Sequence, residues 1–384
     1  MQMLFIIPLL KTENPYYIIV NILTDNGENT MQNEKTSVLV LAQCDLTMRE
    51  TLNTRFGTQC TFTFAENGEH PTAEQLRAAA VIFGEPSEAQ LAQTENLRLL
   101  QLTWAGADKY TRMENLPQSV VLANASGAFG TIIAEYAIGS LVALYRSFGR
   151  YWSNKQAHIW QKYDHAETIS GKTALVLGMG DIGANVARRL KVFGAAVLGV
   201  KRTAVSAVPA DFDEAHTLDA LDALLPRADI VIGCLPNTRE TAGLLTAERL
   251  HAMKAGAVLV NVGRGSLAGT DDLVSALQDG HLGGAALDVF ETEPLPADCP
   301  LWDMENVLLT PHIAGPSFGG SADVQNTIWH ICMDNLERYL TGNPLKNVVH
   351  RSEGDCYAFP AGIATKRKRA ESHAVGSFLV LSSF

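Results

Sequence analysis

Between residue 37 and about residue 125, short apolar runs alternate with longer polar stretches. Apolar runs of four or five residues bounded by polar segments are typical of buried β-strands, and the stretch 72–79 between two of them is compatible with a helix. This alternation predicts a small α/β domain. The runs are 38–41, 80–83, 99–102 and 120–122.

The same alternation becomes regular after Lys172. Repeated strand-then-helix order predicts a parallel sheet covered by helices on both faces, the doubly wound α/β class. One helix is expected to have Thr270 as its cap and to end at Gly280. The apolar runs that predict strands are 173–177, 195–200, 229–235, 257–262, 285–289 and 307–310.

No apolar run reaches the roughly 18 to 20 residues that span a bilayer. The segment 135–145 is nearly free of polar residues but is shorter than that, so we predict a buried helix that bridges domains or subunits. The stretch Leu4 to Leu10 has no basic residue ahead of it and no small-residue cleavage site after it, which argues against a signal peptide. A membrane is therefore not an expected partner.

Composition favours a globular protein of two domains, with 384 residues, 47% of them hydrophobic and 18% charged. The formal net charge of −11 leaves no excess of cations for phosphate backbones, so nucleic acid is not an expected partner. The basic run 366–369 reads as a solvated tail, with a nuclear-import signal as the alternative. Six cysteines without a C-x-x-C pair suggest neither a metal site nor a disulfide framework, and favour the reducing cytoplasm.

A glycine-rich turn follows the strand 173–177 and has the sequence Gly178-Met179-Gly180-Asp181-Ile182-Gly183. Apolar residues recur every four positions after it, which predicts a helix that begins at the turn. In this context the first glycine permits the turn, the second lets backbone amides approach a pyrophosphate and the third lets helix and strand pack closely. The helix N-terminus favours the phosphate charge. The motif predicts a dinucleotide cofactor.

The end of the next strand bears on which dinucleotide is bound. An NAD site normally has Asp or Glu there to bind the ribose 2′-hydroxyl, whereas this chain has Lys201 and Arg202 followed by Thr203. Two cations and a hydroxyl suit a 2′-phosphate, so NADP is favoured over NAD. The alternative is that both cations point into solvent.

Three candidate catalytic residues follow predicted strands at the edge where a doubly wound sheet binds its ligands. Arg264 can bind a carboxylate in a bidentate manner. His312 can exchange a proton near neutral pH, and Glu293 can orient its ring. A lone Arg is more often a surface ion pair, a lone Glu is more often a solvated charge, and a lone His can be a strand-end cap. Together, however, the three indicate hydride transfer at a 2-oxo or 2-hydroxy acid.

The motifs GMGDIG, LPNTRETAGLL, LVNVGRGSL, ALDVFETEPLP and PLWDMENVLLTPHIAG resemble those of the D-isomer-specific 2-hydroxyacid dehydrogenases from about Leu97 to Val349. The resemblance implies that Arg264 binds the substrate carboxylate and that Glu293 and His312 form the acid/base pair. It implies that the backbone amides of Ala105 and Gly106 complete the carboxylate site. The resemblance further assigns Leu235, Pro236, Thr241, Val262, Gly263 and Asp288 to the surroundings of the cofactor.

The resemblance also implies a Rossmann domain of residues 129–317 and a smaller flavodoxin-like substrate domain of residues 36–128 to which 318–350 return. Residues 1–35 and 351–384 are then non-core tails. Family members usually form homodimers through the nucleotide domain. Trp104 stands where a small polar residue is usual, which indicates a bulkier or more closed substrate pocket.

Two other functions fit parts of the pattern. Corepressors on the same scaffold bind NAD(H) and act through partners, and a pure sensor of that kind would turn over no oxo acid. Formate dehydrogenases of this type have Gln where Glu293 stands, so Glu293 argues against formate oxidation. The sequence leaves the identity of the 2-oxo acid and the physiological direction open.

Overall fold

The computed structural model describes residues 35–65, 70–164, 166–351 and 355–356. The expectations for residues 1–34 and for the basic run 366–369 lie outside this part of the chain. Arg351, expected at the start of a tail, is anchored by its guanidinium, which donates to the carbonyls of Leu116 and Pro117 at 2.8 and 2.9 Å and to that of Val120. Val349–His350 (β13) pairs with Asp355–Cys356 (β14).

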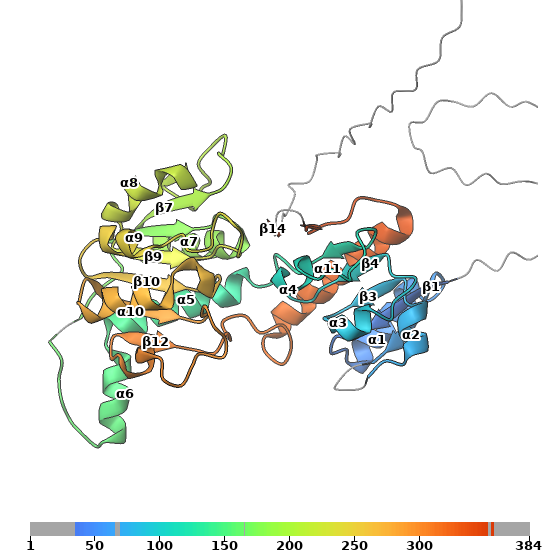
Figure 1. Cartoon of the computed structure of the whole chain (residues 1–384), viewed down its shortest axis with the longest axis horizontal. Coiled ribbons are helices and arrows are strands. Elements are labelled where there is room, and N and C mark those ends of the chain that lie inside the picture. Colours follow the sequence, from blue (N-terminus) through green and yellow to red (C-terminus); the bar gives the residue numbers. More distant parts are fainter. Residues whose placement is uncertain (1–34, 66–69, 165, 352–354, 357–384) are drawn as a thin grey trace, which may run out of the picture. The chain divides into compact units, whose positions relative to one another are not determined.

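The first sheet has five parallel strands in the order β2-β1-β3-β4-β5, the flavodoxin-like arrangement (Figure 1). Alternate residues of its strands enter two different cores. Leu39 and Ile82 pack with Leu76 and Tyr110 on one face, while Val38 and Phe83 pack on the other. The strands are β1 (Thr36–Val40), β2 (Cys60–Phe64), β3 (Val81–Phe83), β4 (Leu99–Gln101) and β5 (Val121–Ala123), and the helices that precede or follow them are α1 (Leu46–Phe56), α2 (Ala73–Ala78), α3 (Glu88–Leu91) and α4 (Asp108–Thr111).

The second sheet has seven parallel strands in the order β12-β11-β10-β9-β6-β7-β8 (Figure 1). The order reverses between β6 and β9, and a doubly wound sheet binds its ligands at such a point. The prediction of two doubly wound parallel sheets is therefore confirmed. The strands are β6 (Thr173–Leu177), β7 (Ala196–Lys201), β8 (Glu214–Thr217), β9 (Ile230–Gly233), β10 (Ala257–Asn261), β11 (Leu282–Leu287) and β12 (Val307–Leu309).

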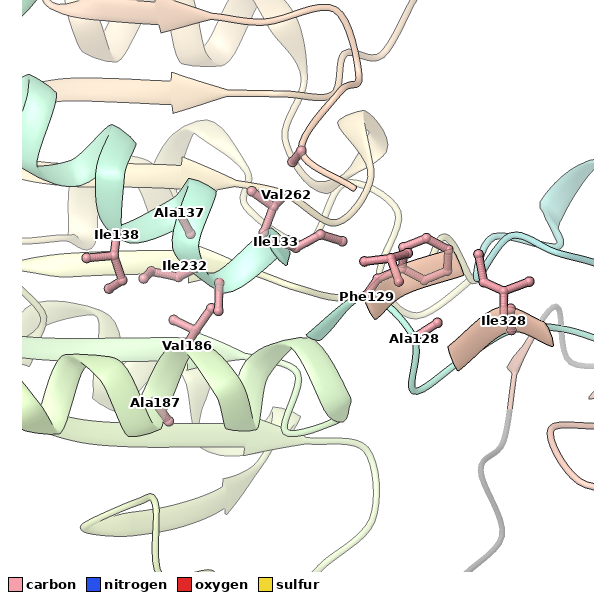
Figure 2. Close-up of a cluster of buried hydrophobic side chains, with 14 of the residues drawn as sticks. Ala128, Phe129, Ile133, Ala137, Ile138, Val186, Ala187, Ile232, Val262 and Ile328 are labelled. Carbon is pink, nitrogen blue, oxygen red and sulfur yellow. The ribbon is translucent and has the colours of Figure 1, made fainter. Parts of the chain in front are cut away.

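Helices cover both faces of this second sheet. On one face the helices α5 (Gly130–Tyr145) and α7 (Asp181–Val192) pack against β9, and Figure 2 shows Ala137 and Val186 close to Ile232. The opposite face is covered by α8 (Leu221–Leu224), α9 (Ala247–Ala252) and α10 (Thr270–Gln278). Short 3-10 turns occupy Leu218–Ala220, Leu225–Arg227, Gly265–Leu267 and Pro300–Asp303.

Two further helices lie before and after the second sheet in the chain. Phe148–Gln156 (α6) follows α5, and Ala322–Thr341 (α11) follows β12. α11 packs against the first sheet, because Trp329 meets the ring of Phe83 edge-on and Asn335 donates to the Gln101 side chain at 2.6 Å. No helix of the described ranges has both the length and the apolar character needed to cross a bilayer.

The apolar runs located most strands, but two strands of the large sheets and the short pair β13 and β14 were missed. β2 has the sequence CTFTF with only its first residue fully buried, and β8 has EAHT with no buried residue. Both are edge strands without a continuous apolar run, so a search for such runs does not reveal them. The expected helix 135–145 begins earlier, at Gly130. Thr270 is the first residue of α10 and Gly269 caps it, because the Thr270 amide and hydroxyl bond to the Glu291 carboxylate instead.

Candidate active site

The glycine-rich turn connects β6 to α7 and requires glycine for two different reasons. Gly178 has φ +106°, a left-handed conformation, and a Cβ atom there would lie 2.8 Å from the carbonyl oxygen of Cys234. A Cβ atom at Gly183 would lie 1.8 Å from the Gly178 carbonyl oxygen, so the helix can approach the strand only without a side chain. At Gly180, the cap of α7, no heavy atom lies within 4 Å of a Cβ position. The turn thus leaves room for a phosphate at a helix N-terminus.

A pocket of about 660 Å³ opens at this turn and brings residues from both sheets together. Its size is within the range of small-molecule and cofactor sites. It is lined by all of the predicted cofactor residues except Asp288. The two predicted substrate-loop residues and Arg264 line it as well. The predicted residues that line it are Gly178, Gly180, Asp181, Ile182, Gly183, Lys201, Arg202, Leu235, Pro236, Thr241, Val262, Gly263, Ala105, Gly106 and Arg264.

Burial changes the acidity of two groups in this pocket. Burial raises the pKa of the Cys234 thiol to about 12, so the thiol remains neutral near physiological pH. Burial also raises the pKa of the Asp181 carboxyl, while hydrogen bonds from the Gly130 amide and the Asn185 side chain act in the opposite direction. Cys234 therefore adds no charge to the pocket wall beside the glycine turn.

Lys201 and Arg202 lie at the nucleotide end of the pocket, where β7 ends. Arg202 also lines an adjoining hollow of about 450 Å³, together with the acidic residues Asp219 and Glu240. Arg249 lines the same hollow, but its guanidinium is held by Asp222 at 2.7 Å. The two cations therefore lie side by side at the end of β7, with carboxylates farther along the adjoining hollow.

Arg264 follows β10 and reaches across to the first sheet. Its Nε donates to Asp108 at 2.8 Å, and its Nη1 donates to the carbonyl of Gly263 at 2.8 Å. A Cβ atom at Gly106 would lie 2.1 Å from Nη2, so the guanidinium lies directly against the backbone of the predicted substrate loop. The cation and the amides that were expected to share a carboxylate are thus adjacent.

The substrate loop that follows β4 is held by residues of its own lobe. Oε1 of Glu85 accepts from the amides of Thr103 and Trp104 at 2.7 and 3.2 Å, and Asn124 donates to the carbonyl of Ala105 at 2.6 Å. Burial raises the pKa of Glu85, and these hydrogen bonds from Thr103 and Trp104 act in the opposite direction. The loop is therefore fixed before any ligand arrives.

Trp104 connects this loop to the segment that follows His312. Its indole Nε1 donates to Ser317 Oγ at 3.0 Å, although about half of the residue, 53%, remains exposed. The bulky residue that the sequence indicated is therefore at the side of the site and links two loops.

His312 and Glu293 are hydrogen bonded to each other. Nδ1 of His312 lies 2.9 Å from Oε2 of Glu293, and Oε1 of Glu293 accepts from the amide of Phe290 at 2.9 Å. His312 has a left-handed backbone, φ +55°, and its amide donates to the carbonyl of Asp288 at 2.8 Å. A histidine held in a sparsely populated conformation by surrounding bonds is typical of functional sites.

Asp288 is held by hydrogen bonds from the segment that bears His312. It is 2% exposed and lies outside the pocket lining, and its carboxylate accepts from the hydroxyl of Thr310 at 2.7 Å and from the amides of Ile313 and Ala314 at 2.8 and 2.9 Å. Its contacts hold the backbone on both sides of His312. Asp288 thus supports the loop that bears the imidazole.

His312 and Glu293 also lie outside the pocket lining, and 51% of the His312 side chain is exposed. The loop of Glu293 nevertheless touches the loop of Arg264. A Cβ atom at Gly265 would lie 1.8 Å from the carbonyl carbon of Phe290, three residues before Glu293. His312 belongs to a third loop, after β12, and is joined to these two through its hydrogen bond to Glu293.

Sequence reasoning missed Asp108, Glu85 and Ser317. Glu85 follows β3, so its place at the carboxyl end of a strand could have marked it. Asp108 bonds to Arg264, 156 residues away in the chain, and Ser317 bonds to Trp104, 213 residues away. No local sequence pattern indicates such pairs. Within the described residues, no three His, Cys, Asp or Glu side chains are grouped so that they could hold a metal ion.

Comparison with known proteins agrees with this geometry. Residues 138–314 match the family model of the D-isomer-specific 2-hydroxyacid dehydrogenase NAD-binding domain. A glyoxylate reductase from Thermofilum pendens is 34% identical over 264 residues, which are 67% of this chain and 76% of that protein. Among solved structures, a D-isomer-specific 2-hydroxyacid dehydrogenase family protein from Aeromonas salmonicida is 34% identical, with a TM-score of 0.73 over 83% of this chain and 99% of that chain.

A second solved structure bears on the cofactor. An NADPH-dependent glyoxylate/hydroxypyruvate reductase from Sinorhizobium meliloti, in complex with NADP and sulfate, is 26% identical, with a TM-score of 0.70 over 84% of this chain and 100% of that chain. The fold and the site thus define a dinucleotide-dependent oxidoreductase. The chain belongs to the D-isomer-specific 2-hydroxyacid dehydrogenase family, whose members are NAD(P)-dependent and act on small molecules.

Proposed function

We propose that this enzyme transfers a hydride between NADPH and C2 of a small 2-oxo acid, as a D-2-hydroxyacid dehydrogenase or a glyoxylate/hydroxypyruvate reductase. We also assign residues 36–128 and 318–350 to the substrate domain and 129–317 to the dinucleotide-binding domain. The names of the Thermofilum and Sinorhizobium relatives support this substrate class.

The cofactor fits the described residues. Gly180 leaves open space at the start of α7, and Gly183 permits the close approach of helix and strand that forms the cradle. Lys201 and Arg202 would hold the 2′-phosphate, and Leu235, Pro236 and Val262 would line the nicotinamide side. When bound, the cofactor supplies the hydride for C2.

The side chains would then bind the substrate carboxylate and transfer the proton. Arg264, with the amides of Ala105 and Gly106, binds the substrate carboxylate. Because Nδ1 of His312 is engaged by Glu293, Nε2 is the atom left to donate a proton to the C2 oxygen as that oxygen gains charge. The carboxylate of Glu293 holds the ring through Nδ1, so that Nε2 stays available for this step.

The observation that carries the proposal is the 2.9 Å bond from His312 to Glu293, whose loop is in contact with that of Arg264. A cofactor-binding sensor needs a dinucleotide pocket but has no need of an oriented acid/base pair. The family's chemistry needs both, which is why the enzymatic function is preferred.

The test is a panel of glyoxylate, hydroxypyruvate and phenylpyruvate, each with NADPH and with NADH, followed by the loss of reduced-cofactor absorbance. We expect turnover with at least one acid and higher kcat/KM with NADPH. Absence of turnover on every acid, together with tight NAD(H) binding, would favour the sensor. Use of NADH much more efficiently than NADPH would refute the cofactor preference alone.

We also propose a homodimer formed through the nucleotide domain. Four large apolar side chains on and after α6 are exposed, which is costly for a monomer and is typical of a subunit interface. Static light scattering on the purified protein tests this, and a monomer mass at micromolar concentration would contradict it. The exposed residues are Phe148 at 56%, Trp152 at 63%, Ile159 at 52% and Trp160 at 98%.

For the location we propose a reducing cytoplasm. Free thiols are present at Cys44, Cys60, Cys234, Cys299 and Cys332. All of these except Cys234 are buried. Such thiols are usual in proteins of reducing compartments. Fractionation of the source cells with an activity assay would test the assignment.

A further inference from the structure

The ion pair between Arg264 and Asp108 connects two loops that the proposed function treats separately. Asp108 begins α4, after β4 of the first sheet, whereas Arg264 follows β10 of the second sheet. Their Nε and Oδ2 atoms are 2.8 Å apart, and the side chains are only 28% and 25% exposed. The pair is thus sheltered from solvent, and it is not one of the exposed pairs that contribute little.

The contacts of Arg264 fix the plane of its guanidinium. The group is planar with five donors in fixed directions, so engagement of two of them determines where the others point. Nε is held by Asp108 and Nη1 by the Gly263 carbonyl, while Nη2 lies against Gly106. The edge between Nη1 and Nη2 points away from Nε by covalent geometry, and that edge can meet a carboxylate with two parallel hydrogen bonds.

We propose that Asp108 is a positioning residue that orients Arg264 for the substrate carboxylate. This inference rests on the proposed function, because it takes Arg264 as the carboxylate ligand. Asp108 touches the guanidinium and acts through it. Without Asp108 the long arginine side chain regains rotamer freedom, which each binding event must then remove.

The charge of Asp108 has an opposing effect, because a nearby carboxylate partly neutralises Arg264 and repels the substrate. The two effects predict opposite signs for removal of Asp108. Oδ2 contacts Nε, the nitrogen farthest from the free edge, so repulsion acts over a longer distance than the orienting bond. We therefore expect orientation to dominate.

Two substitutions separate orientation from charge. Asp108→Ala removes the acceptor and the charge together, whereas Asp108→Asn removes the charge and keeps an oxygen that can accept the Nε hydrogen. Both are assayed with glyoxylate at saturating NADPH, and the binding of oxamate, an unreactive 2-oxo acid analogue, is followed by the fluorescence of bound NADPH. Lys109→Ala, the next residue of α4, is the local control.

We expect Asp108→Ala to raise the KM for glyoxylate and the Kd for oxamate about tenfold, with kcat changed less than about threefold. Asp108→Asn should restore both constants to within about threefold of wild type, and the Kd for NADPH should not change in either variant. Thermal melting of each variant with NADPH checks that the fold is retained. Lys109→Ala should leave the KM for glyoxylate near that of wild type.

An unchanged or lowered KM in Asp108→Ala would overturn the inference, as would an Asp108→Asn variant that is impaired as much as the alanine variant. An equal loss of NADPH affinity would indicate a general structural role and would also overturn it. A wild-type protein that neither turns over any oxo acid nor binds oxamate would refute the proposed function and this inference together. If the wild type turns over an oxo acid and Asp108→Ala has the same KM for it, the inference alone is refuted.

Discussion

The phosphate cradle of the pocket is formed by one continuous strand, turn and helix, whereas the proposed substrate side is assembled from loops of two sheets. On the cofactor side, six consecutive residues, 178–183, form the cradle at the start of α7. On the substrate side, Arg264 of the second sheet meets Asp108 of the first, and Trp104 meets Ser317. A site of the first kind depends on local backbone geometry, while one of the second kind depends on how distant loops are held together.

The largest expected effect falls on the substrate side, at His312. His312→Ala removes the proton donor, and loss of a general acid typically lowers kcat by about 10²- to 10⁴-fold. Steady-state kinetics with a 2-oxo acid and NADPH measure it, with NADPH binding as the control that should not change. A variant that keeps more than a tenth of the wild-type kcat would show that another group handles the proton.

Glu293→Gln is the companion variant, because Gln keeps the shape of Glu293 but loses the charge beside the imidazole. We expect a smaller loss of kcat than in His312→Ala, since the ring remains in place. Full retention of turnover would remove Glu293 from the acid/base assignment.

On the cofactor side, the third glycine should be the most sensitive. In Gly183→Ala the new methyl group would lie 1.8 Å from a backbone oxygen, so strand and helix must separate. Overpacking of this kind costs roughly 1–3 kcal/mol, and we expect a lower melting temperature together with loss of NADPH binding. Gly180→Ala is the matched control, because its methyl group enters open space and should leave the melting temperature of the cofactor-free protein nearly unchanged. Equal destabilisation by both variants would contradict this account of the turn.

A smaller change is expected from Arg202. Arg202→Ser removes a cation from the nucleotide end and should reduce the preference for NADPH over NADH about tenfold, with little effect on kcat at saturating cofactor. The ratio of the two kcat/KM values measures it. If the ratio stays the same, Arg202 does not bind the 2′-phosphate.

The smallest change is expected from Trp104. Trp104→Ala removes the indole that bonds to Ser317, which should widen the site and improve the kcat/KM of phenylpyruvate relative to glyoxylate by about threefold to tenfold. A variant that loses activity on both acids equally would show that the tryptophan holds the loop and does not limit substrate size.

The difference between the two sides of the pocket also explains which parts of the fold and the site could be predicted from the sequence. The glycine turn, the cations after β7 and the residues after β10 follow apolar strands directly, so their positions at one sheet edge follow from the strand order. The two sheets were predicted from the same apolar runs, except for the polar edge strands β2 and β8. Asp108, Glu85 and Ser317 lie in polar loops whose meaning depends on partners brought near only by the fold. The place of Asp288 near the nicotinamide was inferred from family likeness and stays a prediction, while its carboxylate accepts from the Thr310 hydroxyl and from the amides of Ile313 and Ala314.

The contact between Gly265 and Phe290 has a consequence for redesign of this enzyme. The main chain at Gly265 lies directly against that of Phe290, so the distance between the loops of Arg264 and Glu293 is set by backbone, and the His312 ring is hydrogen bonded to Glu293. The distance between the carboxylate ligand and the proton donor is therefore fixed, and it must match the first two carbons of the substrate. Acceptance of longer or bulkier acids must therefore be engineered at Trp104, where a side chain rather than backbone leaves scope for change.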